Sequence, residues 1–274
     1  MTIQKTTSLI ASLPLFALMA CQAQAAPTLP DYSSATFVPG TVVDNSYFPM
    51  TDGLTRVYVG EFEEDGELMR ESFELTNTGP GRVLLGVPTW TQRDRAYEGG
   101  LLVEETRDYY AQDTDGNVWY FGEDVTNYVY DDDGDLIETN ADSSWLAGVN
   151  DALPGLIMPS ALTVGFNYYQ EFAVDDEALD HGTIASIGNT VTIAIGTFTD
   201  VVQVLEGSDL DPDFREFKYY APGVGLILAE EGLDSNLQDP ELSVELVATV
   251  AVPATLPLLT TALAGMGIAL RRRV

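Results

Sequence analysis

"YYAQDTDGNVWYFGED" (Tyr109–Asp124) is the stretch of sequence that decides the fold. At its centre, Asp115-Gly116 is a dipeptide that tolerates the positive φ angles of a tight hairpin turn. Residues typical of β-strands flank this dipeptide on both sides. We therefore predict two antiparallel strands, Leu101–Gln112 and Val118–Tyr130, joined by a turn at DTDG.

The same pattern of turns and alternation continues along the chain. Asp-Gly recurs at 65–66 and 133–134, and Gly-Gly occurs at 99–100. Side chains alternate with period two in "YYQEFAV" (Tyr168–Val174) and in "TVTIAIGTF" (Thr190–Phe198). Since no amphipathic run is long enough for a substantial helix, the sequence predicts an all-β antiparallel meander. We expect about 10–12 strands forming a barrel, half-barrel or sandwich.

The N-terminal end carries an export signal. An uncharged apolar run, residues 8–20, is followed by small residues at Ala23 and Ala25. This layout predicts a signal peptide over residues 1–25, a signal helix cleaved after Ala25. "LMAC" offers an alternative, in which Cys21 is lipidated. Both interpretations predict export.

The C-terminal end, "AVPATLPLLTTALAGMGIALRRRV" (Ala251–Val274), has no charge between Glu245 and Arg271. Its dense apolar part, 254–270, would form a helix about 25 Å long, which is at the short limit for crossing a hydrocarbon core of about 30 Å. Arginines beside a membrane span stay cytoplasmic. We therefore expect a transmembrane helix that leaves residues 26–250 outside the inner membrane.

This tail resembles the PEP-CTERM sorting signal, particularly its Val-Pro-Leu-Pro-Ala subtype. Val252 and Pro253 begin the motif, Leu256–Leu270 corresponds to the apolar span, and the closing cluster is Arg271, Arg272 and Arg273. "VPAT" departs from the pattern because it lacks the Leu-Pro pair between Val-Pro and Ala-Thr. The resemblance implies processing by signal peptidase and an exosortase. It further implies delivery to the cell surface or to an extracellular polysaccharide matrix.

Between these ends we expect a linker at 26–46, one β-domain at 47–245 and the sorting signal with its transmembrane helix at 246–274. The 43 acidic residues all lie between the ends, whereas four of the 12 cations lie in them, so the middle carries 8 − 43 = −35 charges. Such a field repels nucleic acid, which excludes a nucleic-acid partner. The single cysteine, Cys21, leaves the domain without a disulfide.

The acidic turns raise the question of calcium. Full calcium loops are excluded, because Ala111 and Gly122 occupy the first and twelfth positions around Gly116. A weak Ca²⁺ site shared by two turns remains an alternative to solvated turns. Its candidate ligands are Asp113, Asp115, Asp131 and Asp133.

Aromatic doublets recur along the predicted strands. Since adjacent side chains of a strand point to opposite faces, each doublet sends one ring inward and one outward. The rings either fill the core and pair across strands, or one set lines a concave face that binds glycan or lipid. The candidate platform residues are Tyr110, Trp119, Tyr169 and Tyr220.

Catalysis has little support in the sequence. His181 is the sole histidine, so neither a Ser-His-Asp triad nor a zinc site is expected. A carboxylate pair could hydrolyse a glycoside. Nominal candidates for that pair are Glu104, Glu105, Glu123 and Asp124. Three functions remain: a non-catalytic surface protein that binds glycan or lipid, a hydrolase of matrix polysaccharide, and a passive acidic surface component.

The folded part also resembles an uncharacterised family of exported bacterial proteins. The resemblance rests on the opening stretch, on "WLAGVNDALPGLIMP" (Trp145–Pro159) and on "FKYYAPGVGLILAEE" (Phe217–Glu231). It implies a secreted β-domain and assigns no catalytic residues.

Overall fold

The computed structural model describes residues 26–64, 67–131 and 133–251. The predicted signal peptide, with Ala23, Ala25 and Cys21, lies outside these residues. So do the sorting residues Val252, Pro253, Arg271, Arg272 and Arg273. Within the described ranges, no helix is both long and apolar enough to span a membrane.

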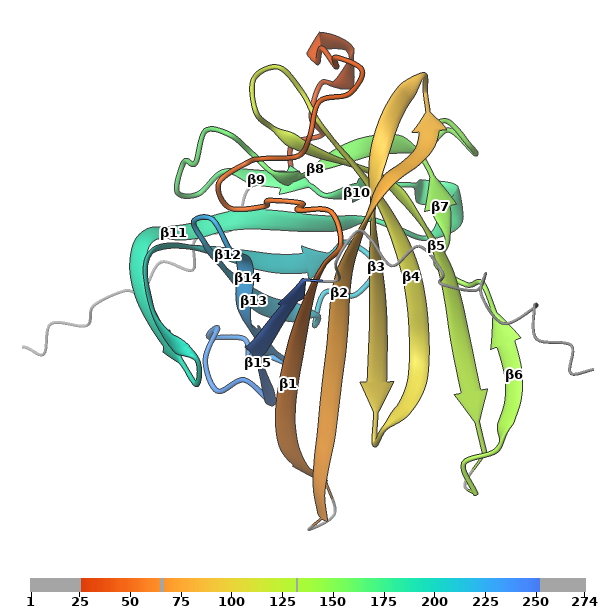
Figure 1. Cartoon of the computed structure of the whole chain (residues 1–274), viewed down its shortest axis with the longest axis vertical. Helices are drawn as coiled ribbons and strands as arrows, with labels where there is room; N and C mark the ends of the chain where they lie inside the picture. The colour runs from red at the N-terminus through yellow and green to blue at the C-terminus, as the bar shows by residue number, and fades with distance from the viewer. Residues whose placement is uncertain (1–25, 65–66, 132, 252–274) are drawn as a thin grey trace, which may run out of the picture.

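The described residues form one antiparallel sheet of 15 strands, which curls into a nearly closed barrel (Figure 1). The elements in chain order are η1 (Tyr32–Ser34), β1 (Leu54–Glu64), β2 (Glu67–Leu84), β3 (Val87–Glu98), β4 (Leu101–Gln112), β5 (Val118–Tyr130), β6 (Leu136–Asn140), β7 (Trp145–Leu146), β8 (Leu153–Met158), β9 (Asn167–Tyr169), β10 (Glu171–Phe172), η2 (Val174–Asp176), β11 (Asp180–Ile193), β12 (Gly196–Ser208), β13 (Arg215–Ala221), β14 (Gly225–Glu231) and β15 (Leu242–Ala251). Thirteen strands follow one path, β10-β8-β5-β4-β3-β2-β1-β15-β14-β13-β12-β11-β9, while β6 and β7 both pair with β5. The predicted all-β antiparallel meander is thus confirmed.

The hairpin turns lie at the Asp-Gly and Gly-Gly dipeptides that the sequence singled out. β4 and β5 have the predicted bounds, and the pairs at 99–100, 115–116 and 133–134 all fall between paired strands. Gly116 and Gly134 adopt φ angles of +88° and +81°, which explains why glycine is preferred there. One expected strand is different: Thr190–Phe198 is a hairpin end, because β11 stops at Ile193 and β12 starts at Gly196.

The barrel closes at one short segment, residues 167–172. Its first half, β9, pairs with β11, and its second half, β10, pairs with β8. At Gln170, between the two halves, the backbone N–H donates to the carbonyl of Asp180 on β11 at 2.8 Å. The two ends of the sheet path therefore meet on either side of this residue.

Gly155 on β8 allows this close approach. A Cβ at this position would lie 2.3 Å from the carbonyl oxygen of Gln170. We expect Gly155→Ala to lower the free energy of unfolding by about 2–4 kcal/mol, because a clash between backbones cannot relax cheaply. Chemical denaturation measures the loss. Gly134→Ala is the control: its Cβ meets open space, so it should cost only the about 1–2 kcal/mol of a left-handed backbone. A smaller loss for Gly155→Ala would mean that the closure is loose.

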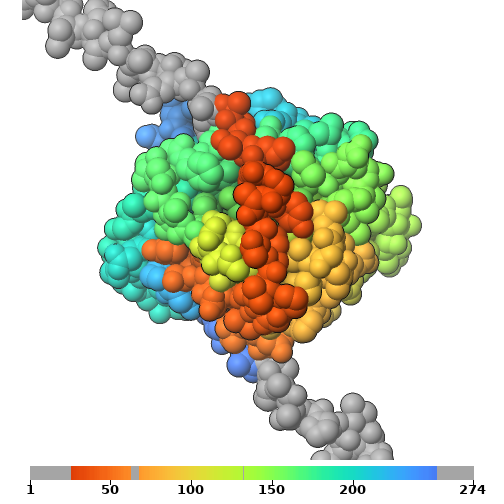
Figure 2. All heavy atoms as spheres, turned by 90° about the horizontal axis from the view of Figure 1, so that it is seen from above, coloured from red at the N-terminus to blue at the C-terminus, as the bar shows by residue number. Residues whose placement is uncertain are grey.

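Residues 26–46, predicted to be a linker, pack against the sheet in this structure. The segment lies across the upper end of the barrel, where it is drawn in red (Figure 2). Phe37 packs against Trp119 and Phe121, with ring centroids 6.3 and 5.6 Å apart, and the indole Nε1 of Trp90 donates to the Thr41 carbonyl at 3.0 Å. The polar composition of the segment concealed these few aromatic anchors. The predicted end of the domain at residue 245 also falls too early, because β15 continues to Ala251.

The apolar core consists of two separate clusters of buried side chains. One buried cluster gathers around Trp119, Phe121 and Trp145, where the N-terminal segment covers the sheet. A second cluster joins β1, β14 and β15 through Tyr58, Ile227 and Leu246. Burial of these apolar side chains stabilises the sheet.

Candidate binding site inside the barrel

A cavity of about 580 Å³ lies inside the barrel, and strands on every side contribute to its lining. One part of its wall is aromatic. Tyr110 and Tyr120 stack with ring centroids 4.8 Å apart. Phe48, two residues after the N-terminal segment, packs against Tyr110 at 4.9 Å and lies 6.5 Å from Tyr220. The volume falls within the range typical of small-molecule sites.

The rest of the lining combines apolar side chains, among them Phe73, Leu75 and Ile157, with many acids. Eight side-chain carboxyls and a single cation, Lys218, line the cavity. The carboxyls belong to Asp94, Glu104, Asp108, Glu171, Asp180, Glu206, Glu216 and Glu231. Carboxylates are rarely found inside proteins without partners, because burial removes their hydration. The cavity lining is therefore the chemically unusual part of this chain.

Two of these carboxyls share one cation of the chain. The Lys218 ammonium lies 2.7 Å from Oε2 of Glu206 and 2.9 Å from Oε1 of Glu216. Gln170 also donates through Nε2 to Oε1 of Glu206 at 2.8 Å. These contacts define a lysine cluster, consisting of Lys218, Glu206 and Glu216.

Four other lining carboxyls form what we call the interior carboxyl cluster: Asp94 on β3, Glu104 and Asp108 on β4, and Glu171 on β10. Among the residues that the structure describes, none of the four forms an ion pair within 4.0 Å of a cation. Among the described residues, the buried Oδ1 atom of Asp94 has no hydrogen-bond partner. An unpaired buried oxygen of this kind costs free energy.

Hydrogen bonding shows that protons are shared beside this cluster. The Tyr120 hydroxyl lies 2.6 Å from Oδ1 of Asp108 and 3.0 Å from Oε2 of Glu123. Because a tyrosine has one proton to donate, the hydroxyl either shares that proton between the two carboxyls or accepts a proton from one of them. A proton on either carboxyl would satisfy both contacts.

The acidities agree with this geometry. Burial raises the pKa of Asp94 well above its usual range, and the charges of Asp108 and Glu104 add to the effect. Burial likewise raises the pKa of Asp108 to about 7 against the hydrogen bond from Tyr120, and it raises the pKa of Glu171 well above normal with help from Asp180. Burial alone would raise the pKa of Glu206 too, but Lys218 holds it below the ordinary value.

We expect these acids to make the protein more stable in acid than at neutral pH. Between about pH 4 and 7, Asp108 and Glu216, each with a pKa of about 7, keep protons in the folded chain that the unfolded chain has lost. The free energy of unfolding should therefore fall as pH rises through this window, by about 1.4 kcal/mol per pH unit for each such carboxyl. Denaturation at pH 5, 6 and 7 measures the slope.

Salt separates the interior contribution from the general repulsion of an acidic surface. Exposed charges are screened at about 0.5 M NaCl, whereas buried ones are screened much less. A slope that persists in high salt supports interior protonation. A slope that vanishes in salt, or stability that rises with pH, would contradict it.

The predicted aromatic platform is only partly assembled. Tyr110 and Tyr220 do line the cavity. Trp119 does not: the turn register pairs Tyr110 with Tyr120, so Trp119 faces the other side, where its indole donates to Asp113 at 2.8 Å. Tyr169 lies in a separate outer pocket and donates to Asp209 at 2.6 Å. Of the Trp119–Tyr120 doublet, Tyr120 and not the predicted Trp119 lines the cavity.

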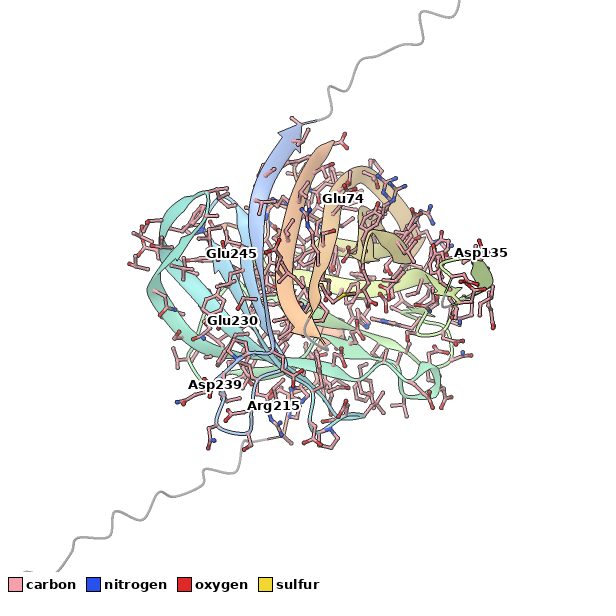
Figure 3. The ribbon with its side chains drawn as sticks, turned by 90° about the horizontal axis from the view of Figure 1, so that it is seen from below. Glu74, Asp135, Arg215, Glu230, Asp239 and Glu245 are labelled. Carbon is pink, nitrogen blue, oxygen red and sulfur yellow. The ribbon has the colours of Figure 1, made fainter. Side chains whose placement is uncertain are left out.

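The predicted shared metal site is not assembled. Asp113 and Asp115 precede β5, whereas Asp131 and Asp133 follow it, so the 13 residues of the strand separate the two turns. The Asp113 carboxylate is occupied by turn hydrogen bonds from Asp115, Asn117 and Trp119. Asp135, in the second turn, lies at the far edge of the molecule from Arg215 and Asp239 (Figure 3). In the described part of the chain, no group of three His, Cys, Asp or Glu residues is arranged to hold a metal ion.

The nominal hydrolase carboxylates divide between the two faces. Glu104 lines the cavity and Glu123 lies behind Tyr120, but Glu105 is paired with Arg95 and Arg107, and Asp124 is paired with Arg82. His181 lines the outer pocket of about 560 Å³, with Nε2 3.9 Å from Asp209. The sequence reasoning did not select Asp94, Asp108, Glu171 or Lys218.

No family model matches this chain, and no curated protein matches it in sequence. Among solved structures, it is similar to a Bacteroides fragilis protein named as exported with a YmcC-like fold (13% identity, TM-score 0.39), and to a Parabacteroides distasonis protein named as a lipoprotein (15% identity, TM-score 0.37). Each match covers 75% of this chain and 99% of the other. These TM-scores are too low to transfer a fold or a function.

Proposed function

We propose that this is an exported, non-catalytic protein whose barrel binds a small organic cation, an alkylammonium compound, at the interior carboxyl cluster. One observation carries the proposal. Four carboxyls without a cationic partner, one of them with an unpaired buried oxygen, line a cavity of about 580 Å³. An ammonium group in the cavity would supply the positive charge that these carboxyls lack. Export, surface sorting and processing by an exosortase remain predictions from the two ends of the sequence.

The aromatic wall supports an organic cation over a bare metal ion. An ammonium with an alkyl chain interacts favourably with the faces of tyrosine and phenylalanine rings and buries its apolar carbons there. The protein holds one such group already, because Lys218 is itself an alkylammonium held by two carboxylates. A metal ion instead needs clustered oxygen ligands at short distances.

The cavity suits the other predicted ligands less well. A lipid tail could contact the apolar part of the lining, but it would leave the carboxyls beside it without a cation. A glycan would use the same rings, and an amino sugar would add the positive charge that the carboxyls lack. Within the glycan prediction, the chemistry thus favours a sugar that carries an amine.

Binding of 1,4-diaminobutane to the full-length chain tests the proposal. At pH 8 and 0.15 M NaCl, calorimetry should show saturable binding of one ligand per chain. Glu104→Gln removes a lining charge and should weaken binding at least tenfold. Glu105→Gln is the matched control, because Glu105 lies next in sequence but faces Arg95 and Arg107 on the outside. Absence of saturable binding, or equal effects of both changes, would overturn the proposal.

A second candidate function, hydrolysis by paired carboxylates, is favoured by one observation. In the lysine cluster, Glu206 has a pKa below normal, whereas burial raises the pKa of its neighbour Glu216 to about 7. Glycosidases also pair an ionised and a protonated carboxyl, but their two carboxyls flank the substrate, whereas Glu206 and Glu216 here share the Lys218 ammonium. Release of reducing ends from matrix polysaccharide, lost in Glu216→Gln, would establish this function in place of simple binding.

A further inference from the structure

Arg56, on β1, is a buried cation without an acidic partner. Its residue is only 4% exposed, and among the described residues it forms no ion pair within 4.0 Å. Of the five N–H groups of its guanidinium, one hydrogen bond is made within the described chain, from Nη2 to the carbonyl of Pro49 at 3.0 Å. Burial lowers the pKa of Arg56, against the effect of Tyr58. Since buried charges are usually paired, an anion beside this guanidinium would be stabilised.

Arg56 lines a small space that we call the arginine recess. Its other lining residues are Phe48, Pro49, Tyr58, Leu75, Gln92, Gly225 and Leu226. None of these eight residues is acidic, and the Tyr58 hydroxyl already donates to the carbonyl of Leu226 at 2.8 Å. The recess has a volume of about 20 Å³, which is enough for one water-sized group, such as a carboxylate oxygen, and too small for a whole ligand.

The arginine recess adjoins both the large cavity and the interior carboxyl cluster. Four residues line the recess and the cavity alike: Phe48, Leu75, Gln92 and Leu226. Gln92 and Asp94 are two positions apart on β3, so their side chains lie on one face of the strand, about 7 Å apart along it. Tyr58 feels both places, because burial raises its pKa, the charge of Arg56 opposes this effect and the charge of Asp94 adds to it. A buried cation and buried acids therefore lie side by side on one wall of the barrel.

Resting on the proposed function, we infer that the ligand is a short ω-amino acid, whose ammonium binds the interior carboxyl cluster and whose carboxylate reaches Arg56 in the arginine recess. The planar guanidinium matches the geometry of a carboxylate. A ligand that carried only an anion would be repelled by the lining carboxyls, whereas a zwitterion brings its own cation. A few methylene groups between the two charges suit the spacing along β3, and Phe48, which lines both spaces, provides an apolar surface for them.

Three ligands with the same four-carbon chain test which end groups the full-length chain recognises. They are butylamine, 4-aminobutyrate and butyrate. At pH 8 and 0.15 M NaCl, calorimetry should show that 4-aminobutyrate binds at least tenfold more tightly than butylamine, and that butyrate alone does not bind measurably. Equal affinities for butylamine and 4-aminobutyrate would overturn the amino acid inference and leave the proposed function intact. Failure of these two ligands and of 1,4-diaminobutane to bind would overturn both.

Arg56→Met locates the carboxylate site. It should weaken the binding of 4-aminobutyrate at least tenfold and leave the affinity for butylamine within twofold. Arg82→Met is the control, because Arg82 is half-exposed and pairs with Asp124 at 2.7 Å, so neither affinity should change. Circular dichroism checks that both variants are folded, and if Arg56→Met does not fold, the three ligands on the parent chain decide the matter. Equal weakening of both ligands by Arg56→Met would mean that the arginine only supports the wall, and would overturn the inference.

Discussion

The Asp94→Asn protein should be more stable than the parent chain at pH 8, by about 1–3 kcal/mol, and should bind amines at least tenfold more weakly. Asp94 must either ionise beside Asp108 and Glu104 or keep a proton at a pH where a free aspartate has lost it, and both states cost free energy. An amide removes that cost and can donate to a neighbouring carboxyl. A substitution that stabilises the fold and removes binding is the signature expected of a residue retained for its ligand.

Thermal unfolding with and without 1,4-diaminobutane measures both effects for this variant. The parent chain should gain stability on adding the amine, and Asp94→Asn should not. Glu105→Gln should instead lose up to about 1 kcal/mol, as is usual for a surface ion pair, and should keep the response to the amine. If Asp94→Asn is less stable than the parent at pH 8, its carboxylate must have a stabilising partner, and the interior would not be short of cations.

The strands could be predicted from the sequence because local signals specify them. Asp115-Gly116 and Gly99-Gly100 fix the ends of β4, and its bounds match the prediction. The closure of the barrel could not be predicted, since it depends on Gln170 joining two short strands to different partners. The packing of 26–46 was missed for a similar reason. The rings of Tyr32 and Phe37 hold that segment, and their partner Trp119 lies more than 70 residues further along the chain.

The site was harder to predict because inward and outward carboxyls look alike in the sequence. The pairing of β4 with β5 shifts between Asp108 and Tyr110, so Tyr120 and Glu123 both face the Asp108 carboxyl although three positions separate them. Strict alternation would have turned Glu123 outward. The sequence did contain one signal for Asp94. Asp94 lies between Arg93 and Arg95, and arginines are scarce in this acidic chain. Since Arg95 pairs with Glu105 on the outer face, alternation places Asp94 on the inner face.

Lys218→Met should be the most destabilising single change in the cavity. It leaves Glu206 and Glu216 together without their shared cation, and breaking a buried ion pair from one side costs about 3–5 kcal/mol. Without the ammonium, burial would raise the pKa of Glu206 as it already does that of Glu216. Both acids can then escape the penalty by taking up protons. The loss in free energy of unfolding should therefore be largest at pH 8 and shrink toward pH 5.

A second substitution distinguishes lost charge from lost packing. Lys218→Met combined with Glu206→Gln removes one of the two stranded carboxylates, and it should recover at least about half of the lost stability at pH 8, because coupled groups do not add. Arg215→Met, on the same strand, is the control. Among the described residues, it forms an ion pair with the exposed Asp213 alone, at 3.8 Å, so its effect should stay below about 1 kcal/mol. If Lys218→Met costs the same at pH 5 and pH 8, and the double variant recovers nothing, the lysine stabilises the barrel through its alkyl stem. The carboxyls of the cavity would then carry no uncompensated charge for an amine to neutralise.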